Sequence, residues 1–151
     1  MQTDEMDKRD QEIQALLKLR PVGGNLQLGD QLLDSLQNVF RRETPMSLIA
    51  QSIKDMRGKA MGSKSQSLIG DINIKNGPGG IRDIEFLVQG LQLSNAFAHP
   101  DLVCGNTLEA IERLAVRSFV PVETSRQLRE DYLFLRRVEH LLQVWEDQQI
   151  H

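Results

Sequence analysis

The sequence lacks features that several functional classes require. Its 151 residues include one cysteine, Cys104, which excludes an internal disulfide framework and a multi-cysteine zinc site. No apolar run reaches the roughly 18–20 residues of a membrane span, and the acidic N-terminus lacks a signal peptide's charged-then-apolar plan. The net charge of -3 gives no electrostatic case for nucleic acid or an anionic membrane. These absences predict a soluble, cytoplasmic protein with no nucleic-acid partner and no metal site of its own.

Aromatic residues are also scarce, at 5%, whereas hydrophobic residues make up 40% and charged residues 26%. This is ordinary globular composition, and the length fits one domain. Leucine, glutamine, arginine and glutamate abound, which favours helices. Residues 1–12 are predicted to be a flexible acidic lead-in because they contain almost nothing apolar, and residues 13–151 are predicted to form a helical domain.

Apolar residues recur at helical spacing in six segments, so we expect an all-α bundle of about six helices. The second segment places Leu28, Leu32, Leu36, Val39 and Phe40 on one face. The last segment carries a long apolar seam that runs from Leu128 to Trp145 and faces either the core or a partner. The six segments start near residues 13, 28, 44, 81, 106 and 121, with Thr44-Pro45 and Asn106 as expected helix starts.

The helical pattern breaks between residues 62 and 80, where serine, lysine and glycine accumulate. Residues 68–75 alternate in polarity and are expected to form either a short extended segment or an ordered loop. No second strand-like run lies nearby to pair with them, so no sheet is predicted. A glycine-rich loop is expected directly before the fourth helix.

That loop and the helix after it form the most unusual stretch, GPGGIRDIEF at residues 77–86. Glycines permit a close backbone approach, and free N–H groups at a helix start suit a phosphate or carboxylate. If Ile84, Leu87 and Val88 face the core, then a more polar face remains, formed by Arg82, Glu85, Gln89 and Gln92. The alternative is a tight loop whose first-turn acids, such as Asp83, complement the helix dipole.

A second polar group lies on the last helix, where Arg136, Glu139, His140 and Gln143 share a strip beside the apolar seam. Taken alone, such a strip is typical of a solvated helix face. Cys104 has no adjacent base and is interpreted as a structural thiol. The three histidines lack metal-ligand spacing, and Gly62-Ser63 with Asp71 and Asn73 is rejected as a two-metal catalytic loop because one acid is missing.

Four motifs together resemble the glutamine synthetase adenylyltransferase family, with the related PII uridylyltransferases as the nearest neighbours. The likeness spans residues 13–151 in the family's order. The motifs are ALLKLRPVGGN at residues 15–25, IKDMRGK at 53–59, GPGGIRDIEFLVQ at 77–89, and YLFLRRVEHLLQ at 132–143 followed by DQQIH at 147–151.

The resemblance implies an enzyme that adds AMP to a tyrosine of glutamine synthetase, or removes it by phosphorolysis, in the regulation of nitrogen assimilation. In that family a nucleotidyltransferase domain holds the metal and is paired with a helical domain. This chain resembles the helical domain alone, and resembles the adenylyl-removing N-terminal half more than the adenylylating half. Mg²⁺ and ATP or phosphate are therefore expected to bind the parent enzyme. This chain is expected to need no cofactor, to contain no catalytic residue and to be inactive alone.

The expected partners are its own nucleotidyltransferase domain, glutamine synthetase and a PII-type signal protein. The alternative function is a non-catalytic helical module that docks glutamine synthetase or a PII-type regulator. The residues that the resemblance assigns to the substrate and nucleotide site are Gly79, Gly80, Arg82, Asp83, Glu85, Arg136 and Glu139.

Overall fold

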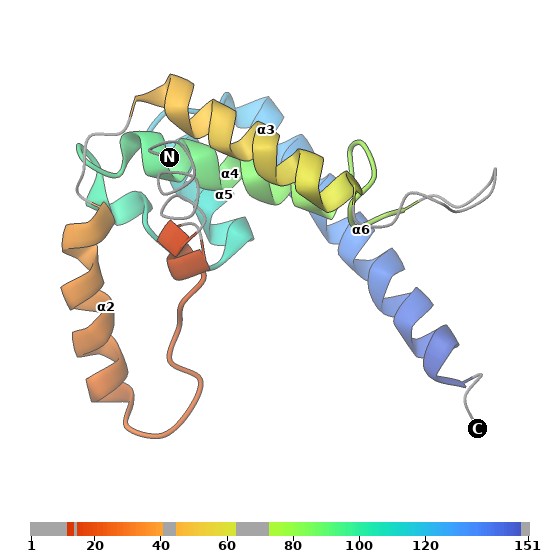
Figure 1. The fold of residues 1–151 in the computed structure, drawn as a ribbon, viewed down its shortest axis with the longest axis horizontal. Helices are drawn as coiled ribbons and strands as arrows, with labels where there is room; N and C mark the ends of the chain where they lie inside the picture. The colour runs from red at the N-terminus through yellow and green to blue at the C-terminus, as the bar shows by residue number, and fades with distance from the viewer. Residues whose placement is uncertain (1–11, 14, 41–44, 63–72, 149–151) are drawn as a thin grey trace.

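The computed structural model describes residues 12–13, 15–40, 45–62 and 73–148, and Figure 1 shows these ranges as helices joined by turns. The described part contains no strand, which confirms the all-α prediction. Within it, no helix combines the length and the apolar character needed to cross a bilayer. The helices are α2 (Leu26–Phe40), α3 (Met46–Gly62), α4 (Ile81–Asn95), the short 3-10 helix η1 (Pro100–Leu102), α5 (Thr107–Val116) and α6 (Val122–Gln148).

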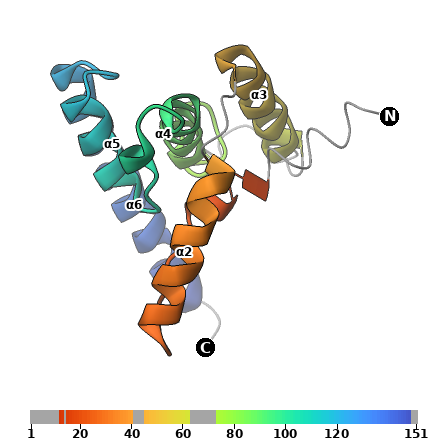
Figure 2. The same ribbon diagram turned by 90° about the vertical axis from the view of Figure 1, so that its left-hand side faces the viewer.

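Helix α4 is the central element, because it packs against α3, α5 and α6. Figure 2 shows α4 with α3 on one side and with α5 and α6 on the other. The α3–α4 approach is close at Gly90, where a Cβ atom would lie 2.4 Å from Cδ1 of Ile53. A side chain at position 90 would therefore push against α3.

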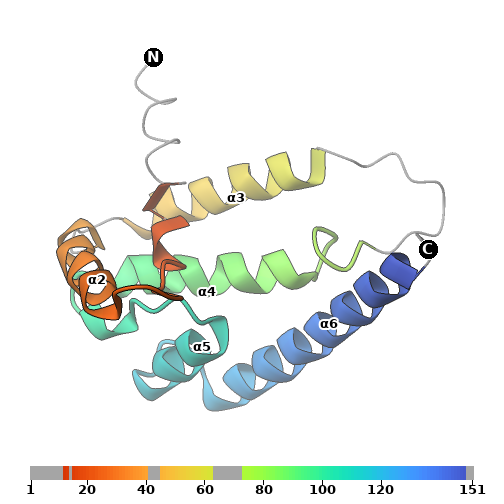
Figure 3. The ribbon, with the colours of Figure 1, turned by 90° about the horizontal axis from the view of Figure 1, so that it is seen from below.

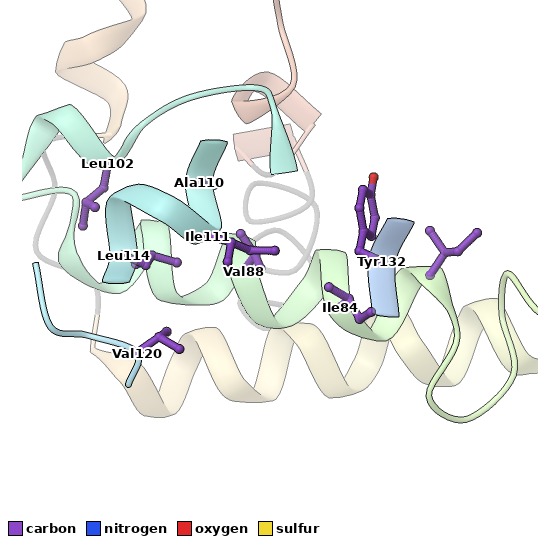
Figure 4. Close-up of a cluster of buried hydrophobic side chains, with 9 residues drawn as sticks. Ile84, Val88, Leu102, Ala110, Ile111, Leu114, Val120 and Tyr132 are labelled. Carbon is purple, nitrogen blue, oxygen red and sulfur yellow. The ribbon is translucent and has the colours of Figure 1, made fainter. Parts of the chain in front are cut away.

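The main core forms where α4, α5 and α6 meet (Figure 4). Most of its buried side chains come from α4 and α5, and the others come from η1, the segment before α6 and Tyr132 of α6. Leu102 and Leu114 are fully buried in it. The members are Ile81, Ile84, Val88, Leu102, Ala110, Ile111, Leu114, Val120 and Tyr132.

A smaller core joins the N-terminal segment to α2 and the end of α4. It contains Leu17, Phe40 and Ala96, with Leu36 packed against it. The predicted apolar face of α2 is thus buried at its C-terminal end, whereas Leu28 and Leu32 are exposed. The predicted face is therefore buried only in part, because the first turns of α2 extend away from the other helices (Figure 1).

The apolar seam of α6 also has two parts. Leu128, Tyr132 and Leu135 pack against or belong to the main core, whereas Leu142 and Trp145 are exposed. Figure 3 shows the second half of α6 diverging from α5 and extending beyond the N-terminal end of α4. The first half of the seam therefore faces the core, and the second half has no cover among the described residues.

The predicted helix starts agree closely with the structure where it describes them. Asn106 caps α5, since its side-chain oxygen accepts the N–H groups of Leu108 and Glu109. Helix α3 begins at Met46, one residue after the predicted start at Pro45, and Thr44 lies outside the described residues. In the segment 68–75, residues 74 and 75 lie in a turn, so this part is not extended. Residues 68–72 and the acidic residues 1–11 lie outside the described ranges. Of the rejected two-metal loop, Gly62 is the last residue of α3, whereas Ser63 and Asp71 also lie outside these ranges.

Leu114→Ala is expected to lower the free energy of unfolding by about 2–5 kcal/mol, because it leaves a cavity in the main core. The matched control is Leu141→Ala, since Leu141 is 68% exposed. That change should stay within about 0.5 kcal/mol. Urea unfolding followed by circular dichroism measures both, and equal losses in the two variants would contradict the described core.

Candidate functional site

The glycine-rich turn, residues 73–80, caps the start of α4 with its own backbone. The N–H of Ile81 donates to the carbonyl of Ile74 at 3.0 Å, and the N–H of Arg82 donates to that of Lys75 at 3.1 Å. The N–H of Asp83 donates to the Gly80 carbonyl at 3.1 Å. The prediction of free N–H groups that bind an anion is therefore wrong, because the turn already satisfies the donors of this helix end.

The glycines serve the folding of the turn itself. A Cβ atom on Gly77 would lie 2.5 Å from the carbonyl oxygen of Asn73, and one on Gly80 would lie 2.5 Å from that of Ile74. Gly79 has a φ of 73°, in the left-handed region that favours glycine. The close backbone approach that these glycines permit is therefore made within the turn itself.

Asp83 anchors the turn to α3. Its Oδ2 accepts the N–H of Gly79 at 2.8 Å and a hydrogen bond from Nη2 of Arg57, also at 2.8 Å. The carboxylate thereby fixes the turn, the first turn of α4 and the last half of α3 relative to one another. Both contacts are internal to the domain, which supports the structural interpretation of this first-turn acid.

The faces of α4 differ from the prediction at two places. Leu87 is 46% exposed and lines a groove between α3 and α4. Gln89 and Gln92 are buried, and the Gln92 amide donates to the carbonyls of Leu102 and Cys104 at 2.7 and 3.0 Å. The predicted polar face is therefore not a surface at these glutamines, and Gln92 is covered by η1 and the loop that follows it. Of Arg82, Glu85, Gln89 and Gln92, Arg82 alone is exposed.

Glu85 is the buried centre of a polar network. Its Oε1 accepts hydrogen bonds from the Tyr132 hydroxyl at 3.0 Å and from Nη2 of Arg136 at 2.7 Å. Its Oε2 pairs with Nζ of Lys18 at 2.9 Å. Three segments far apart in the sequence therefore meet at this carboxylate.

Tyr132 links this network to the hydrophobic core. Its hydroxyl accepts from Nε and Nη2 of Arg136, each at 3.1 Å, while it donates to Glu85. The Arg136 guanidinium also lies 5.2 Å from the centre of the tyrosine ring. Figure 4 shows the ring at the edge of the apolar cluster, with its hydroxyl pointing away from the labelled aliphatic side chains. Tyr132 thus positions Arg136 through both its ring and its hydroxyl.

The network continues to the glycine-rich turn through Glu139. One oxygen of this carboxylate accepts from Nη1 of Arg136 at 2.7 Å, and the other lies 3.5 Å from Nζ of Lys75. The structure therefore brings together Glu85, Arg136 and Glu139, as the site prediction requires. Arg82 lies one helical turn before Glu85, and its backbone contacts Lys75.

Sequence reasoning missed Lys18, Lys75 and Tyr132. Tyr132 precedes Arg136 by four residues on one helix, a spacing that places the two side chains next to each other and could have identified it. Lys18 and Lys75 lie outside the long helices, so no periodicity relates them to the site. Their contacts become visible through the tertiary structure.

The cations of the network are more exposed than its carboxylates. The side chains of Lys18, Lys75 and Arg136 are between 40% and 52% exposed, whereas those of Glu85 and Glu139 are 11% and 14% exposed. Three cations face two carboxylates, which leaves one positive charge in surplus among these described residues. The side chains of this network that reach solvent are therefore mainly its cations.

The carboxylates are held in the ionised form. Burial alone would raise the pKa of Glu85, but the hydrogen bonds and charges of Lys18, Tyr132 and Arg136 outweigh it and lower the pKa. The pKa of Glu139 is lowered as well, since Arg136 and Lys75 outweigh its own desolvation. Likewise, burial opposes the charge of Arg136, but hydrogen bonds to Tyr132 and Glu139 raise its pKa.

The geometry does not fit a metal site. Within the ranges that the structure describes, no three His, Cys, Asp or Glu side chains come together to hold an ion. Glu85 and Glu139 are each engaged by two or more cationic or hydroxyl partners, so their oxygens are not available as a ligand set. His140 is exposed on α6, and Cys104 is half-buried with its pKa raised by desolvation, which suits a structural thiol.

Glu85→Gln is expected to lower the free energy of unfolding by roughly 1–3 kcal/mol at pH 7, since it removes a charged hydrogen-bond acceptor. The folded-state pKa of Glu85 lies below its ordinary value of 4.5. The stabilisation is therefore present above pH 4.5 and is lost as the pH falls through the folded-state pKa.

The free energy of unfolding should be measured from pH 7 to pH 3. The difference between wild type and Glu85→Gln in this free energy should become smaller toward pH 3. Glu130→Gln is the control, because Glu130 forms an exposed pair with Arg126 that contributes little. A gap of constant size over this pH range would contradict the ionised, paired state of Glu85.

Comparison with known proteins places these residues in a family context. The family described as GlnD PII-uridylyltransferase matches residues 48–151. A bifunctional glutamine synthetase adenylyltransferase/adenylyl-removing enzyme of Rhodopseudomonas palustris is 38% identical over 150 residues, which are 97% of this chain and 15% of that protein.

Enzymes with the same description from Streptomyces coelicolor and Hahella chejuensis are also 38% identical, over 133 and 144 residues. These matches cover 88% and 93% of this chain, and 13% and 14% of the relatives. The chain thus spans about one seventh of the length of the curated relatives it matches. No solved structure matches it.

The family match covers more than half of the chain, and the alignment with the Rhodopseudomonas palustris enzyme covers nearly the whole length of this chain. Both matches include the glycine-rich turn, α4 and α6, which build the Glu85 network. The chain belongs to the glutamine synthetase adenylyltransferase and PII-uridylyltransferase family.

Proposed function

We propose that this helical chain forms one wall of a nucleotide and substrate site that an adjacent nucleotidyltransferase domain completes. That domain would transfer AMP to a tyrosine of glutamine synthetase or remove it by phosphorolysis. The observation that carries the proposal is the set of partly exposed cations, Lys18, Lys75 and Arg136, around the buried carboxylates of Glu85 and Glu139. A surplus of exposed positive charge suits the phosphate groups that both reactions share.

The two arginines are the proposed phosphate ligands. A guanidinium presents paired N–H donors in a planar fork that matches two phosphate oxygens. Arg82 is exposed at the first turn of α4, and the Arg136 side chain is 40% exposed although three polar groups hold it. We assign the direct contacts to these arginines, with Arg82 first.

The other predicted site residues act through the arginines or through the backbone. Glu85 fixes the guanidinium of Arg136 through Nη2, and Glu139 pairs with Nη1 in the absence of a ligand. Asp83, Gly79 and Gly80 fix the turn that precedes Arg82. Their proposed role is therefore to position the wall of the site, with no step of the chemistry on their own atoms.

The proposed ligands are ATP and phosphate, together with the adenylylated tyrosine of glutamine synthetase. Mg²⁺ belongs to the nucleotidyltransferase domain in this proposal, since the described carboxylates do not form a metal site. The resemblance to the adenylyl-removing half favours phosphorolysis as the reaction, and a PII-type protein as a regulator. The 151 residues alone are proposed to be inactive.

A second candidate function rests on a different observation. The last turns of α6 expose Leu141, Leu142, Val144 and Trp145. Such a surface suits a protein partner, so the chain would be a docking module for glutamine synthetase or a PII-type regulator. If the chain is a docking module, ATP and phosphate should not bind at Arg82 or Arg136. This expectation distinguishes the docking function from the nucleotide site.

In a longer protein that carries this chain beside a nucleotidyltransferase domain, Arg82→Gln and Arg136→Gln should each lower the rate of AMP release from adenylylated glutamine synthetase. The expected loss is roughly 10²-fold or more, as for a lost donor to transition-state charge. Arg82→Gln should leave the unfolding transition unchanged because the side chain is exposed.

The matched control is Arg126→Gln, since Arg126 lies on the same helix as Arg136 and its ion pairs with Glu123 and Glu130 are exposed. Its turnover should equal that of the wild type. Wild-type turnover in Arg82→Gln and Arg136→Gln would overturn the proposed site and favour the docking function.

A further inference from the structure

Glu139 bridges two cations that come from different parts of the chain. One carboxylate oxygen lies 2.7 Å from Nη1 of Arg136 on α6, and the other lies 3.5 Å from Nζ of Lys75 in the glycine-rich turn. A single anion with two oxygens therefore occupies the space between an ammonium and a guanidinium. A phosphate group presents the same arrangement of oxygens with more negative charge.

The two cations are held differently. Arg136 is fixed by Tyr132, Glu85 and Glu139 together. Lys75 has a fixed backbone, because its carbonyl accepts the N–H of Arg82 at the start of α4. Its side chain is 52% exposed, and its pair with Glu139 is long. The ammonium can thus move by a rotamer change while its attachment point stays in place.

We propose that Lys75 and Arg136 form a two-cation clamp for a phosphate group, and that Glu139 occupies the clamp when no phosphate is bound. This inference rests on the proposed function and adds Lys75 to its phosphate-binding residues. The clamp lies beside Arg82, whose backbone N–H binds the Lys75 carbonyl.

The charges of the described network favour this exchange. Lys18, Lys75 and Arg136 outnumber Glu85 and Glu139 by one, so an added anion meets a positive field. Glu85 keeps its own partners Lys18 and Tyr132 when phosphate enters, so the buried carboxylate is never left unpaired. Glu139 pairs with Lys75 and Arg136 and therefore competes with the incoming anion for the same two cations.

Because Glu139 competes with phosphate for Lys75, substitutions of these two residues should change the phosphate affinity in opposite directions. Inorganic phosphate is titrated into the 151-residue protein by isothermal calorimetry and by NMR of the arginine Nε–H signals. Lys75→Gln should weaken phosphate binding roughly tenfold, the effect of one lost charged hydrogen bond. Glu139→Gln should instead tighten it severalfold, because the competing anion has been removed.

The matched control is Lys54→Gln, which removes an exposed lysine of α3 and should leave the dissociation constant unchanged. Unfolding transitions of all variants establish that each is folded at the titration temperature. Weaker binding in Glu139→Gln would overturn the clamp, since Glu139 would then support the ligand. Absence of phosphate binding in the wild type would overturn it as well.

The outcomes also separate this inference from the proposed function. If Arg136→Gln weakens phosphate binding and Lys75→Gln does not, the clamp is wrong while the arginine site stands. If AMP release in the longer protein survives both Arg82→Gln and Arg136→Gln, the proposed function itself is wrong. A loss of binding in Lys75→Gln with a gain in Glu139→Gln supports both.

Discussion

The structure depends on keeping one buried carboxylate charged. Glu85 lies on the central helix with its side chain 11% exposed, and an unpaired charge there would cost several kcal/mol. Lys18, Tyr132 and Arg136 meet that requirement from three separate segments. The constraint therefore fixes the N-terminal segment and α6 relative to α4. The same hydrogen bonds hold Arg136 at the surface, so the need to satisfy a buried acid also builds the proposed binding wall.

The position of α4 explains why the fold and the site are coupled. On one side, Asp83 joins the glycine-rich turn to α3 through Arg57. On the other, Glu85 joins the helix to α6 through Tyr132, a residue of the main core. Two acids two residues apart thus face opposite neighbours. Because both act within one turn of Arg82, packing on either side of α4 determines where that arginine is presented.

The sequence predicts the helices well, because long amphipathic segments and the Asn106 cap are local signals. It predicts burial less well: Gln92 looks like a surface residue yet is buried, since η1 and the loop after it cover its side chain. The backbone capping by residues 74 and 75 also has no periodic signal, so the turn resembled an open anion site. Of the candidate site, Glu85, Arg136 and Glu139 do meet, whereas the contacts of Lys75 required the three-dimensional arrangement.

This chain is proposed to supply one wall of a site shared with a nucleotidyltransferase domain. The most direct test is AMP release from adenylylated glutamine synthetase in the presence of phosphate and Mg²⁺. The 151-residue protein is compared with the same chain joined to a nucleotidyltransferase domain. We expect AMP release by the joined protein and none by the 151 residues alone. Release of AMP by the 151 residues alone would contradict it.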